Sequence, residues 1–340
     1  MEQSSVTPTR VIKIAVILGM ILVVTAIGAT LVGSARIGVV QGLKGLFYAW
    51  QGDNAFLQPQ ERTILFSIRL PRVLFAGLVG AALSSAGVVF QALLRNPLAE
   101  PYILGISGGA AVGAIIGIVA IGSLPFCVPL LAFGGAVLTV LLVFLIGGAG
   151  RGLNSNTLLL AGVIINAFFS AVIMFLVSLS GSADLHTITF WLMGNLSVVR
   201  PGEIVLGGIL LAAGFFIVYA HARTLNMIVT GEETALQLGV EVERVKIRLL
   251  VASSVITAAA VAFSGIIGFV GLIIPHIMRM IFGSDHRLLL PASFLFGASF
   301  LIIADTLART VMPFTELPVG VITAICGAPY FIYLLRRRTV

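Results

Sequence analysis

Few ionisable side chains lie inside apolar segments, and chemistry within a membrane would have to use them. Asp305 and Arg309 stand four residues apart in one such segment, a spacing that places both side chains on one face of a helix. Buried carboxylates in membranes serve as partners of basic residues or as proton relays. We favour a structural ion pair. The alternative is an ion-coupled carrier, for which Asp305 is the sole carboxylate in a suitable position.

Motifs for covalent or hydrolytic chemistry are missing from the sequence. A P-loop needs a lysine after glycine, because backbone amides and the lysine ammonium group jointly bind the nucleotide phosphates. None of the three lysines, Lys13, Lys44 and Lys246, follows a glycine. Cys127 and Cys326 are far apart and fit no metal motif. We therefore expect a protein that is not an enzyme, with no catalytic residues, no metal site and no cofactor.

Composition indicates the elements that must position these groups. Hydrophobic residues make up 59% of the 340 residues and charged residues only 10%, against about 25% charged residues in a soluble domain. Apolar runs of about 20 residues recur along the chain, each long enough to cross about 30 Å of hydrocarbon. None alternates as a barrel strand would. The fold class is therefore an all-α polytopic membrane protein, and the net charge of +7 does not indicate nucleic acid as a partner.

The apolar runs predict about ten transmembrane helices in a single transmembrane domain over residues 1–340. The first run is longer than the 7–15 apolar residues of a secretory signal, which favours an uncleaved span. The expected spans are 11–33, 70–94, 103–122, 126–148, 158–180, 203–221, 248–268, 271–283, 288–309 and 319–335.

An even number of spans places both termini on one side of the membrane. Basic residues mark that side as cytoplasmic, because Arg10 and Lys13 lie at the start of the first span and residues 336–338 are arginines. Arg69, Arg72 and Arg309 are exceptions, since they fall at span ends on the outer side.

Small residues recur at four-residue intervals in the second and third expected spans. Gly105, Gly109, Gly113 and Gly117 form one such series. In lipid, this spacing lets helix backbones approach closely. We favour tight packing as the role of these series, and lining of a transport pathway is the alternative.

The longest cytoplasmic connection, residues 221–246, has the pattern of a short helix outside the membrane. Thr230 followed by Glu233 matches a capping box, and Gly239 is a suitable C-terminal stop. Its apolar residues include Leu225, Met227, Leu236 and Leu238. Two roles remain open from the loop alone: docking of a cytoplasmic partner, or resting on the membrane surface.

Four stretches of the chain resemble the FecCD permeases, the membrane subunits of binding-protein-dependent ABC importers for iron–siderophore complexes, haem and cobalamin. The resemblance covers nearly the whole chain in the same order. Its motifs are SIRLPRVLFAGLVGAALSSAG (67–87) with QALLRNPLAEPYILGISGGAAVGA (91–114), GEETALQLGV (231–240), GFVGLIIPHIMRMIFGSDHRLLLP (268–291), and ADTLART with ELPVGVITAICGAPYFIYLL (304–335).

The resemblance implies a fold and a set of partners. The fold would be the type-II ABC importer permease fold in the inner membrane. Two permease copies would form a pathway at their interface; we expect a homodimer, and the sequence leaves a heterodimer open. Separate ATP-binding cassette subunits would dock at residues 225–243. A periplasmic or lipid-anchored substrate-binding protein would deliver an iron chelate or cobalamin from outside.

The resemblance also implies roles for individual residues. Arg69, Arg72 and Arg309 would receive acidic residues of the binding protein; the alternative is that each reaches to the headgroups. The cytoplasmic gate would include Asn96, Leu98, Ser155 and Asn156, although Asn156 departs from the small hydroxyl residue expected there. The residues expected to couple to the ATPase are Thr230, Gly231, Glu232, Glu233, Ala235, Leu236, Leu238 and Gly239.

Overall fold

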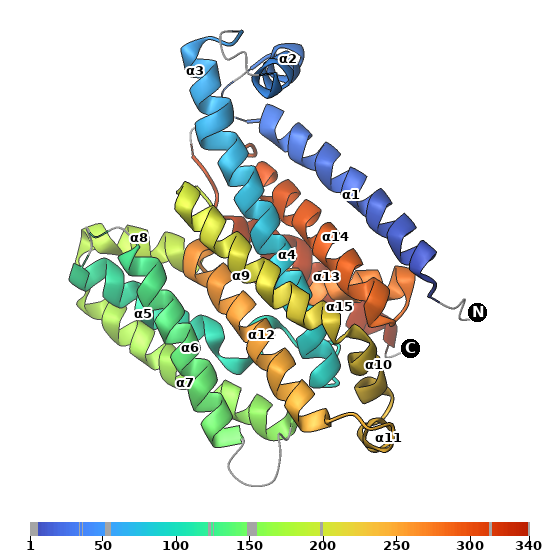
Figure 1. Ribbon diagram of the computed structural model, residues 1–340. Coiled ribbons are helices and arrows are strands. Elements are labelled where there is room, and N and C mark those ends of the chain that lie inside the picture. Colours follow the sequence, from blue (N-terminus) through green and yellow to red (C-terminus); the bar gives the residue numbers. More distant parts are fainter. Residues whose placement is uncertain are drawn as a thin grey trace.

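A computed structural model gives the fold of the protein, and every regular element among the residues that it describes is a helix (Figure 1). The structure describes residues 6–33, 35, 37–51, 56–121, 124, 126–147, 155–197, 200–312 and 315–338. The expected span ends at 122 and 148 lie outside these residues, as do the side chains of Arg337 and Arg338.

The helices follow one another along the chain with short connections. Their bounds are α1 Pro8–Leu31, α2 Val39–Trp50, α3 Pro59–Arg62, η1 Thr63–Arg69, α4 Leu70–Leu93, η2 Pro101–Leu104, α5 Ile106–Ile116, η3 Gly117–Ile121, α6 Cys127–Gly147, α7 Ser155–Leu179, α8 Ser182–Leu192, α9 Pro201–Ala220, α10 Ala222–Thr230, α11 Glu232–Gln237, α12 Val242–Ser264, α13 Val270–Phe282, α14 His286–Ala308 and α15 Val319–Arg338.

Seven helical stretches of the described chain are long and apolar enough to cross a membrane. They are α1, the continuous stretch from α3 through η1 to α4, α6, α7, α9, α12 and α14. Three shorter apolar helices, Ile106–Ala120, Val270–Phe282 and Val319–Tyr333, account for the remaining expected segments. The prediction of an all-α polytopic membrane protein is confirmed.

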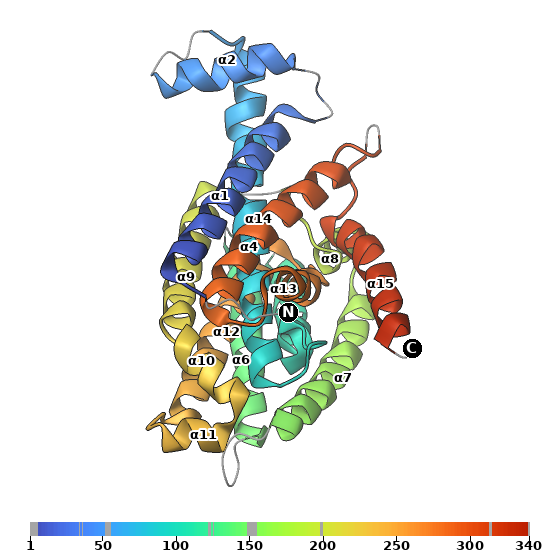
Figure 2. The ribbon, with the colours of Figure 1, turned by 90° about the vertical axis from the view of Figure 1, so that its right-hand side faces the viewer.

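The second expected span is longer than its sequence pattern indicated. The helical stretch Pro59–Leu93 has 35 residues and is about 52 Å long at 1.5 Å per residue. Since the hydrocarbon core is about 30 Å thick, this stretch extends well beyond one end of the bundle (Figures 1 and 2).

Helix α2 was not predicted, because its 12 residues are too few for a span. It lies across the end of the bundle where α3 also lies (Figure 2). Gly42 and Gly45 face the side chains of Leu31 and Leu57, so their lack of a side chain lets α2 pack closely there. We call this the α2 end of the molecule, and the opposite end, which carries α10 and α11, the α11 end.

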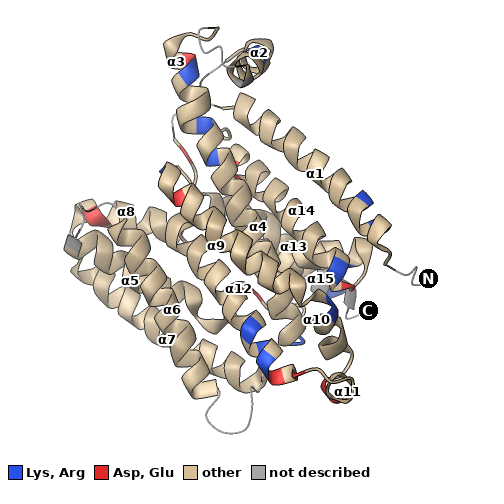
Figure 3. Cartoon of the chain, viewed as in Figure 1, with Lys and Arg blue, Asp and Glu red and all other residues tan. Residues whose placement is uncertain are grey.

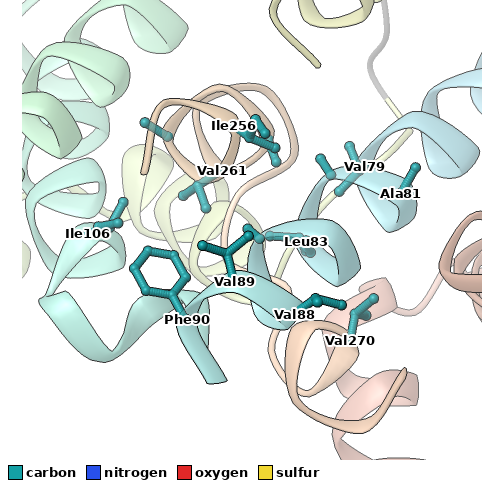
Figure 4. Packing of buried hydrophobic residues seen from close by; sticks show 14 of the residues in the cluster. Val79, Ala81, Leu83, Val88, Val89, Phe90, Ile106, Ile256, Val261 and Val270 are labelled. Carbon is teal, nitrogen blue, oxygen red and sulfur yellow. The ribbon is translucent and has the colours of Figure 1, made fainter. Parts of the chain in front are cut away.

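Helix α4 forms the centre of the molecule, in contact with α9, α12, α13 and α14. Its apolar side chains pack against residues of the surrounding helices (Figure 4). Val79, Leu83 and Phe90 are each at most 1% exposed. Helix α4 is therefore surrounded by protein rather than by lipid, and movement of its neighbours must act on it.

The glycine series pack helix against helix. A Cβ atom at Gly109 of α5 would overlap Thr139 and the carbonyl oxygen of Gly135 in α6. A Cβ atom at Gly80 of α4 would overlap the carbonyl oxygen of Gly297 in α14. The structure therefore confirms close packing as the role of the small residues at these positions.

Charged residues collect towards the two ends of the helix bundle, and the long helices between them are almost free of charge (Figure 3). Helix α1 begins, and α15 ends, on the side of the molecule where α10 and α11 lie (Figure 1). This arrangement agrees with an even number of crossings.

Candidate functional site

Arg72 is the centre of a buried charge cluster at the α2 end. It lies in the first turn of α4, and its side chain is 7% exposed. Its Nε atom donates to both carboxylate oxygens of Asp305 at 3.0 Å, and Nη2 donates to Oδ1 at 2.9 Å. Its Nη1 atom donates to Glu316 at 2.6 Å. This bidentate arrangement binds the start of α4 to the end of α14.

The predicted ion pair between Asp305 and Arg309 is present, but it is the weaker of the two ion pairs that Asp305 makes. The Nε atom of Arg309 lies 3.9 Å from Oδ2 of Asp305. The Nη2 atom of Arg309 instead donates to the backbone oxygen of Ala29 in α1 and to the hydroxyl of Thr306. The main partner of Asp305 is Arg72, which lies 233 residues away in sequence. The sequence spacing gave no signal of this contact.

The third arginine of the cluster joins α1 to the α4 stretch. Arg69 is 3% exposed, and its guanidinium group donates to the backbone oxygens of Thr30, Leu31 and Ala35. None of the three arginines extends freely into solvent, since Arg72 and Arg309 are each 6% exposed.

The three arginines expected to dock a binding protein line one cavity. The cavity has a volume of about 250 Å³ and is lined by Arg69, Arg72, Arg309, Glu316, Gly33, Ala35, Ile64 and Ile68. Three arginines face two carboxylates, Asp305 and Glu316, so the net charge of the five residues is +1. We call these five charged residues the arginine cluster. Chemically it can accept a further carboxylate or another anion.

The expected coupling residues lie at the α11 end in two helices rather than one. Thr230 does not begin the second helix, as its capping pattern predicted, but is the last residue of α10. Its hydroxyl donates to the backbone oxygen of Asn226, one turn earlier. Gly231 is the N-cap of α11 and makes no side-chain capping bond. The predicted capping box is therefore wrong, because the Thr230 hydroxyl is used within α10.

The predicted stop at Gly239 is confirmed. Gly239 has φ of +83°, its N–H donates to Leu236, and the N–H of Val240 donates to Ala235. These two bonds form a Schellman motif, in which glycine is the usual residue with positive φ.

Apolar residues of this region divide between the interior and the surface. Leu225 and Ala235 are fully buried, whereas Leu236 is 57% and Leu238 is 66% exposed. Leu225 thus packs inside the chain, whereas Leu236 and Leu238 remain exposed, as either a partner-docking helix or a helix on the membrane surface would require. We call residues 225–243 the coupling segment; its exposed leucines form an apolar surface next to the charges of Glu232 and Glu233.

Helix α10 is attached to the start of α14. Asn226 donates to Asp285 at 2.8 Å and accepts from the backbone N–H of His286 at 2.9 Å. Although partial burial opposes its ionisation, hydrogen bonds from Arg287 and Asn226 lower the pKa of Asp285 to about 2. Asp285 is therefore ionised throughout the physiological range and caps α14 through the N–H of Arg287.

The four expected gate residues lie where α4 ends and α7 begins. The Oδ1 atom of Asn96 accepts from the N–H of Leu98 at 2.9 Å. The hydroxyl of Ser155 donates to the backbone oxygen of Leu93 at 3.2 Å, so the structure brings the two parts together. Leu98 is 42% exposed, and Asn156 is also exposed.

The chain that follows the Asn96 turn is fixed to an unwound segment between α12 and α13. Glu100 accepts from the N–H of Phe269 at 2.7 Å, and Tyr102 donates to the backbone oxygen of Ile267 at 3.0 Å. Burial raises the pKa of Glu100. These contacts were not predicted, because their partners lie more than 160 residues apart.

Among the described residues, no group of three or more His, Cys, Asp or Glu side chains is arranged to hold a metal ion. The site residues at the two ends offer ionic contacts and an apolar surface, both of which occur in protein–protein interfaces.

Known proteins resemble this chain along nearly its full length. The model of the FecCD transport family matches residues 17–337. The Bacillus subtilis (strain 168) ABC transporter permease protein YvrB is 44% identical, with 82% of this chain and 80% of that protein covered. The cobalamin import system permease BtuC of Halobacterium salinarum is 45% identical, with 82% and 75% covered. The Yersinia pestis hemin transport system permease HmuU is 39% identical, with 94% and 95% covered.

Solved structures agree with these relatives. An inward-facing metal-chelate type ABC transporter is 32% identical and superposes with a TM-score of 0.85 over 96% of this chain and 99% of that chain. PsaBC from Streptococcus pneumoniae, in complex with Fab, is 20% identical with a TM-score of 0.56 over 78% of this chain and 90% of that chain, a likeness of fold alone. The chain is therefore a multi-pass ABC importer permease and belongs to the FecCD transport family.

Proposed function

We propose that this chain is the permease subunit of an inner-membrane importer that moves a bulky metal chelate, either an iron–siderophore complex, haem or cobalamin, into the cell. Relatives named for cobalamin and hemin import support this class of cargo. The chain itself makes or breaks no bond in the cargo, and both of its termini lie in the cytoplasm.

One observation carries the proposal: α14 is bonded at both of its ends to residues expected to meet partner proteins. At the α11 end, Asp285 and the N–H of His286 are bonded to Asn226 of the coupling segment. At the α2 end, Asp305 is bonded to Arg72 of the arginine cluster. A single helix of 23 residues can therefore carry movement between the two faces.

The partners follow from the chemistry of the two ends. The exposed leucines of the coupling segment suit an apolar cleft in a separate ATP-binding cassette subunit. The excess positive charge of the arginine cluster suits acidic residues of a periplasmic or lipid-anchored binding protein, and bidentate arginine–carboxylate contacts give such docking its geometry. A second copy of this chain completes the pathway as a homodimer.

The transport cycle then has four steps. A loaded binding protein docks on the arginine cluster, ATP closes the ATPase subunits, and their movement displaces the coupling segment. The bundle exchanges between outward-open and inward-open states, and the gate of Asn96, Leu98, Ser155 and Asn156 opens and closes. The pathway holds its cargo weakly, since tight binding would prevent release.

Reconstitution tests this proposal. The purified permease is placed in proteoliposomes with or without its ATPase subunits, the binding protein and ATP, and uptake of cobalamin, hemin and a ferric siderophore is measured. We expect concentrative uptake of one of these compounds only with every component present. Uphill transport by the permease alone, or ATP-driven uptake that survives deletion of residues 231–239, would overturn it.

The competing function, an ion-coupled carrier, needs a carboxylate that releases and rebinds a proton. Asp305 is the sole candidate that the sequence offers, and it is held by three hydrogen bonds from Arg72. These bonds join α4 to α14 and give Asp305 a structural role, which is why we favour the permease over the ion-coupled carrier.

A further inference from the structure

Arg95 occupies a backbone position where glycine is the usual residue. Helix α4 ends in a Schellman motif: the N–H of Arg95 donates to Ala92, and the N–H of Asn96 donates to Gln91. Arg95 has φ of +49°, a conformation that disfavours residues with a side chain. The equivalent position at the end of α11 is filled by Gly239. A strained residue persists where its surroundings hold it in place, and it points to a role for the side chain.

The side chain of Arg95 contacts the coupling segment. Its Nη2 atom lies 3.4 Å from Oε1 of Glu232 and 3.4 Å from the backbone oxygen of Ile228. Both contacts come from the segment that α10 and α11 form, so the arginine spans the junction between these two helices.

Glu232 also binds a second basic residue. Its Oε2 atom lies 2.5 Å from Nζ of Lys246 in α12, whose side chain is only 9% exposed. One carboxylate therefore joins three elements: α11, which carries it, the turn after α4, through Arg95, and the first turns of α12, through Lys246. We call these three residues the Glu232 bridge.

The turn that Arg95 belongs to is the turn of the expected gate. Arg95 precedes Asn96 directly, and the residue that accepts from Ser155 is Leu93, two positions before Arg95. Arg95 is thus the side chain that joins Glu232 to the turn of the expected gate. The contact of Asn226 with Asp285, by comparison, leads from the same segment to α14.

We propose that Glu232 is the positioning residue through which movement of the coupling segment reaches the gate, with Arg95 as the receiving group and Lys246 as the group that aims the carboxylate. The proposal rests on the proposed function. It divides transmission into two branches: the Glu232 bridge moves the gate, and Asn226 with Asp285 moves α14 and the arginine cluster.

The test is the number of cargo molecules taken up per ATP hydrolysed by the complete reconstituted transporter. We expect Glu232→Gln and Arg95→Gln each to lower this ratio by about fivefold, the low end of the usual coupling between two sites. Arg244→Gln is the matched control, because Arg244 forms an exposed ion pair with Glu241 at 2.7 Å and is not part of the bridge. It should leave the ratio within about twofold of the unchanged protein.

The double variant Arg95→Gln/Glu232→Gln separates a shared contact from two independent effects. If both residues act through their ion pair, the double variant loses no more than either single variant. Arg95→Gln is the variant less prone to misfold, since it leaves the buried Lys246 paired with Glu232. A misfolded protein would lose uptake and hydrolysis together and keep the ratio of the remaining active molecules.

An unchanged ratio in both single variants, or losses that multiply in the double variant, would overturn the role of the Glu232 bridge. The proposed function fails by a different result, namely that the unaltered protein shows no ATP-dependent uptake of any of the three cargo classes.

Discussion

The two ends of the molecule hold their charges in different ways. In the arginine cluster at the α2 end, the side chains of Arg72 and Asp305 are 7% and 1% exposed and share three hydrogen bonds. In the Glu232 bridge at the α11 end, the side chains of Glu232 and Arg95 are 38% and 53% exposed and lie 3.4 Å apart.

This difference indicates which contacts can change during transport. Separating a buried ion pair leaves a charge without a partner in a medium of low polarity, which costs several kcal/mol. An exposed pair can separate at little cost, because water replaces the lost partner. We therefore interpret Arg72–Asp305 as a fixed joint between α4 and α14, and Arg95–Glu232 as a joint that can open when the coupling segment moves.

The largest effect is expected at the fixed joint. Asp305→Asn removes the bidentate partner of the buried Arg72 and leaves Glu316 as its one remaining carboxylate, so it should lower the free energy of unfolding by about 3 kcal/mol, the low end for breaking a buried pair. Thermal unfolding of the detergent-solubilised protein measures this loss. The control is Asp184→Asn in α8, at a partly exposed residue, which should change stability by less than about 0.5 kcal/mol.

The opposite outcome for Asp305→Asn is informative. A variant that assembles with full stability and yet transports nothing would mean that Asp305 titrates during the cycle. The comparison between a fixed and a movable joint would then be broken, and the ion-coupled carrier would be the better function.

The elements of this comparison differ in how far the sequence predicts them. The apolar runs predicted the long helices, the four-residue spacing of small residues in the second and third spans predicted close packing, as found at Gly80 and Gly109, and Gly239 predicted the end of α11. Each of these depends on residues within a few turns of one another. The docking and gate roles of the predicted site residues stay predictions that experiments must test.

The contacts that join the elements could not be predicted. Arg72 meets Asp305 across 233 residues, and Arg95 meets Glu232 across more than 130 residues. The four-residue spacing of Asp305 and Arg309 pointed to the weaker partner, because local spacing says nothing about which distant helix supplies a closer one. Helix α2 was missed since 12 residues cannot span a membrane. The prediction that Thr230 caps α11 was wrong because its hydroxyl donates to the backbone oxygen of Asn226 within α10.

The second largest effect is expected where α10 meets α14. The pKa of Asp285 falls from 3.8 to about 2 on folding, so its stabilising contribution is complete above pH 3.8 and is lost as the pH falls through 2. After a discount for its 22% exposed side chain, the contribution is about 1–2 kcal/mol.

Thermal unfolding of the unaltered protein and of Asp285→Asn, between pH 7 and pH 2, checks this contribution. The variant should be less stable at pH 5–7 and equal to the unaltered protein near pH 2. A difference that persists at pH 2 would assign the contribution to packing rather than to charge, and Asp285 would not belong in a comparison of charged contacts.

A smaller effect should distinguish the movable joint by its response to salt. The coupling energy between Arg95 and Glu232, measured as a double-mutant cycle of stability, should be about 0.2–1 kcal/mol at low salt. At 1 M salt, where the screening length is about 3 Å, it should nearly vanish. The same cycle for Arg72 and Asp305 should keep most of its value, because salt does not reach a buried pair. Equal salt sensitivity at both ends would remove the basis for calling one joint fixed.

The smallest effect is expected at the exposed pair of Glu241 and Arg244, whose side chains are 62% and 70% exposed. Arg244→Gln should change the free energy of unfolding by less than about 0.5 kcal/mol. Thermal unfolding beside Arg95→Gln provides the measurement, since both variants remove one arginine from an ion pair with glutamate near the α11 end. If Arg95→Gln lowered stability more than Arg244→Gln and left uptake per ATP unchanged, a structural ion pair would account for Arg95, and its strained backbone would have no special significance. If Arg95→Gln is instead close to neutral in stability but lowers uptake per ATP, then the arginine is retained for transmission at a position where glycine would fold more easily.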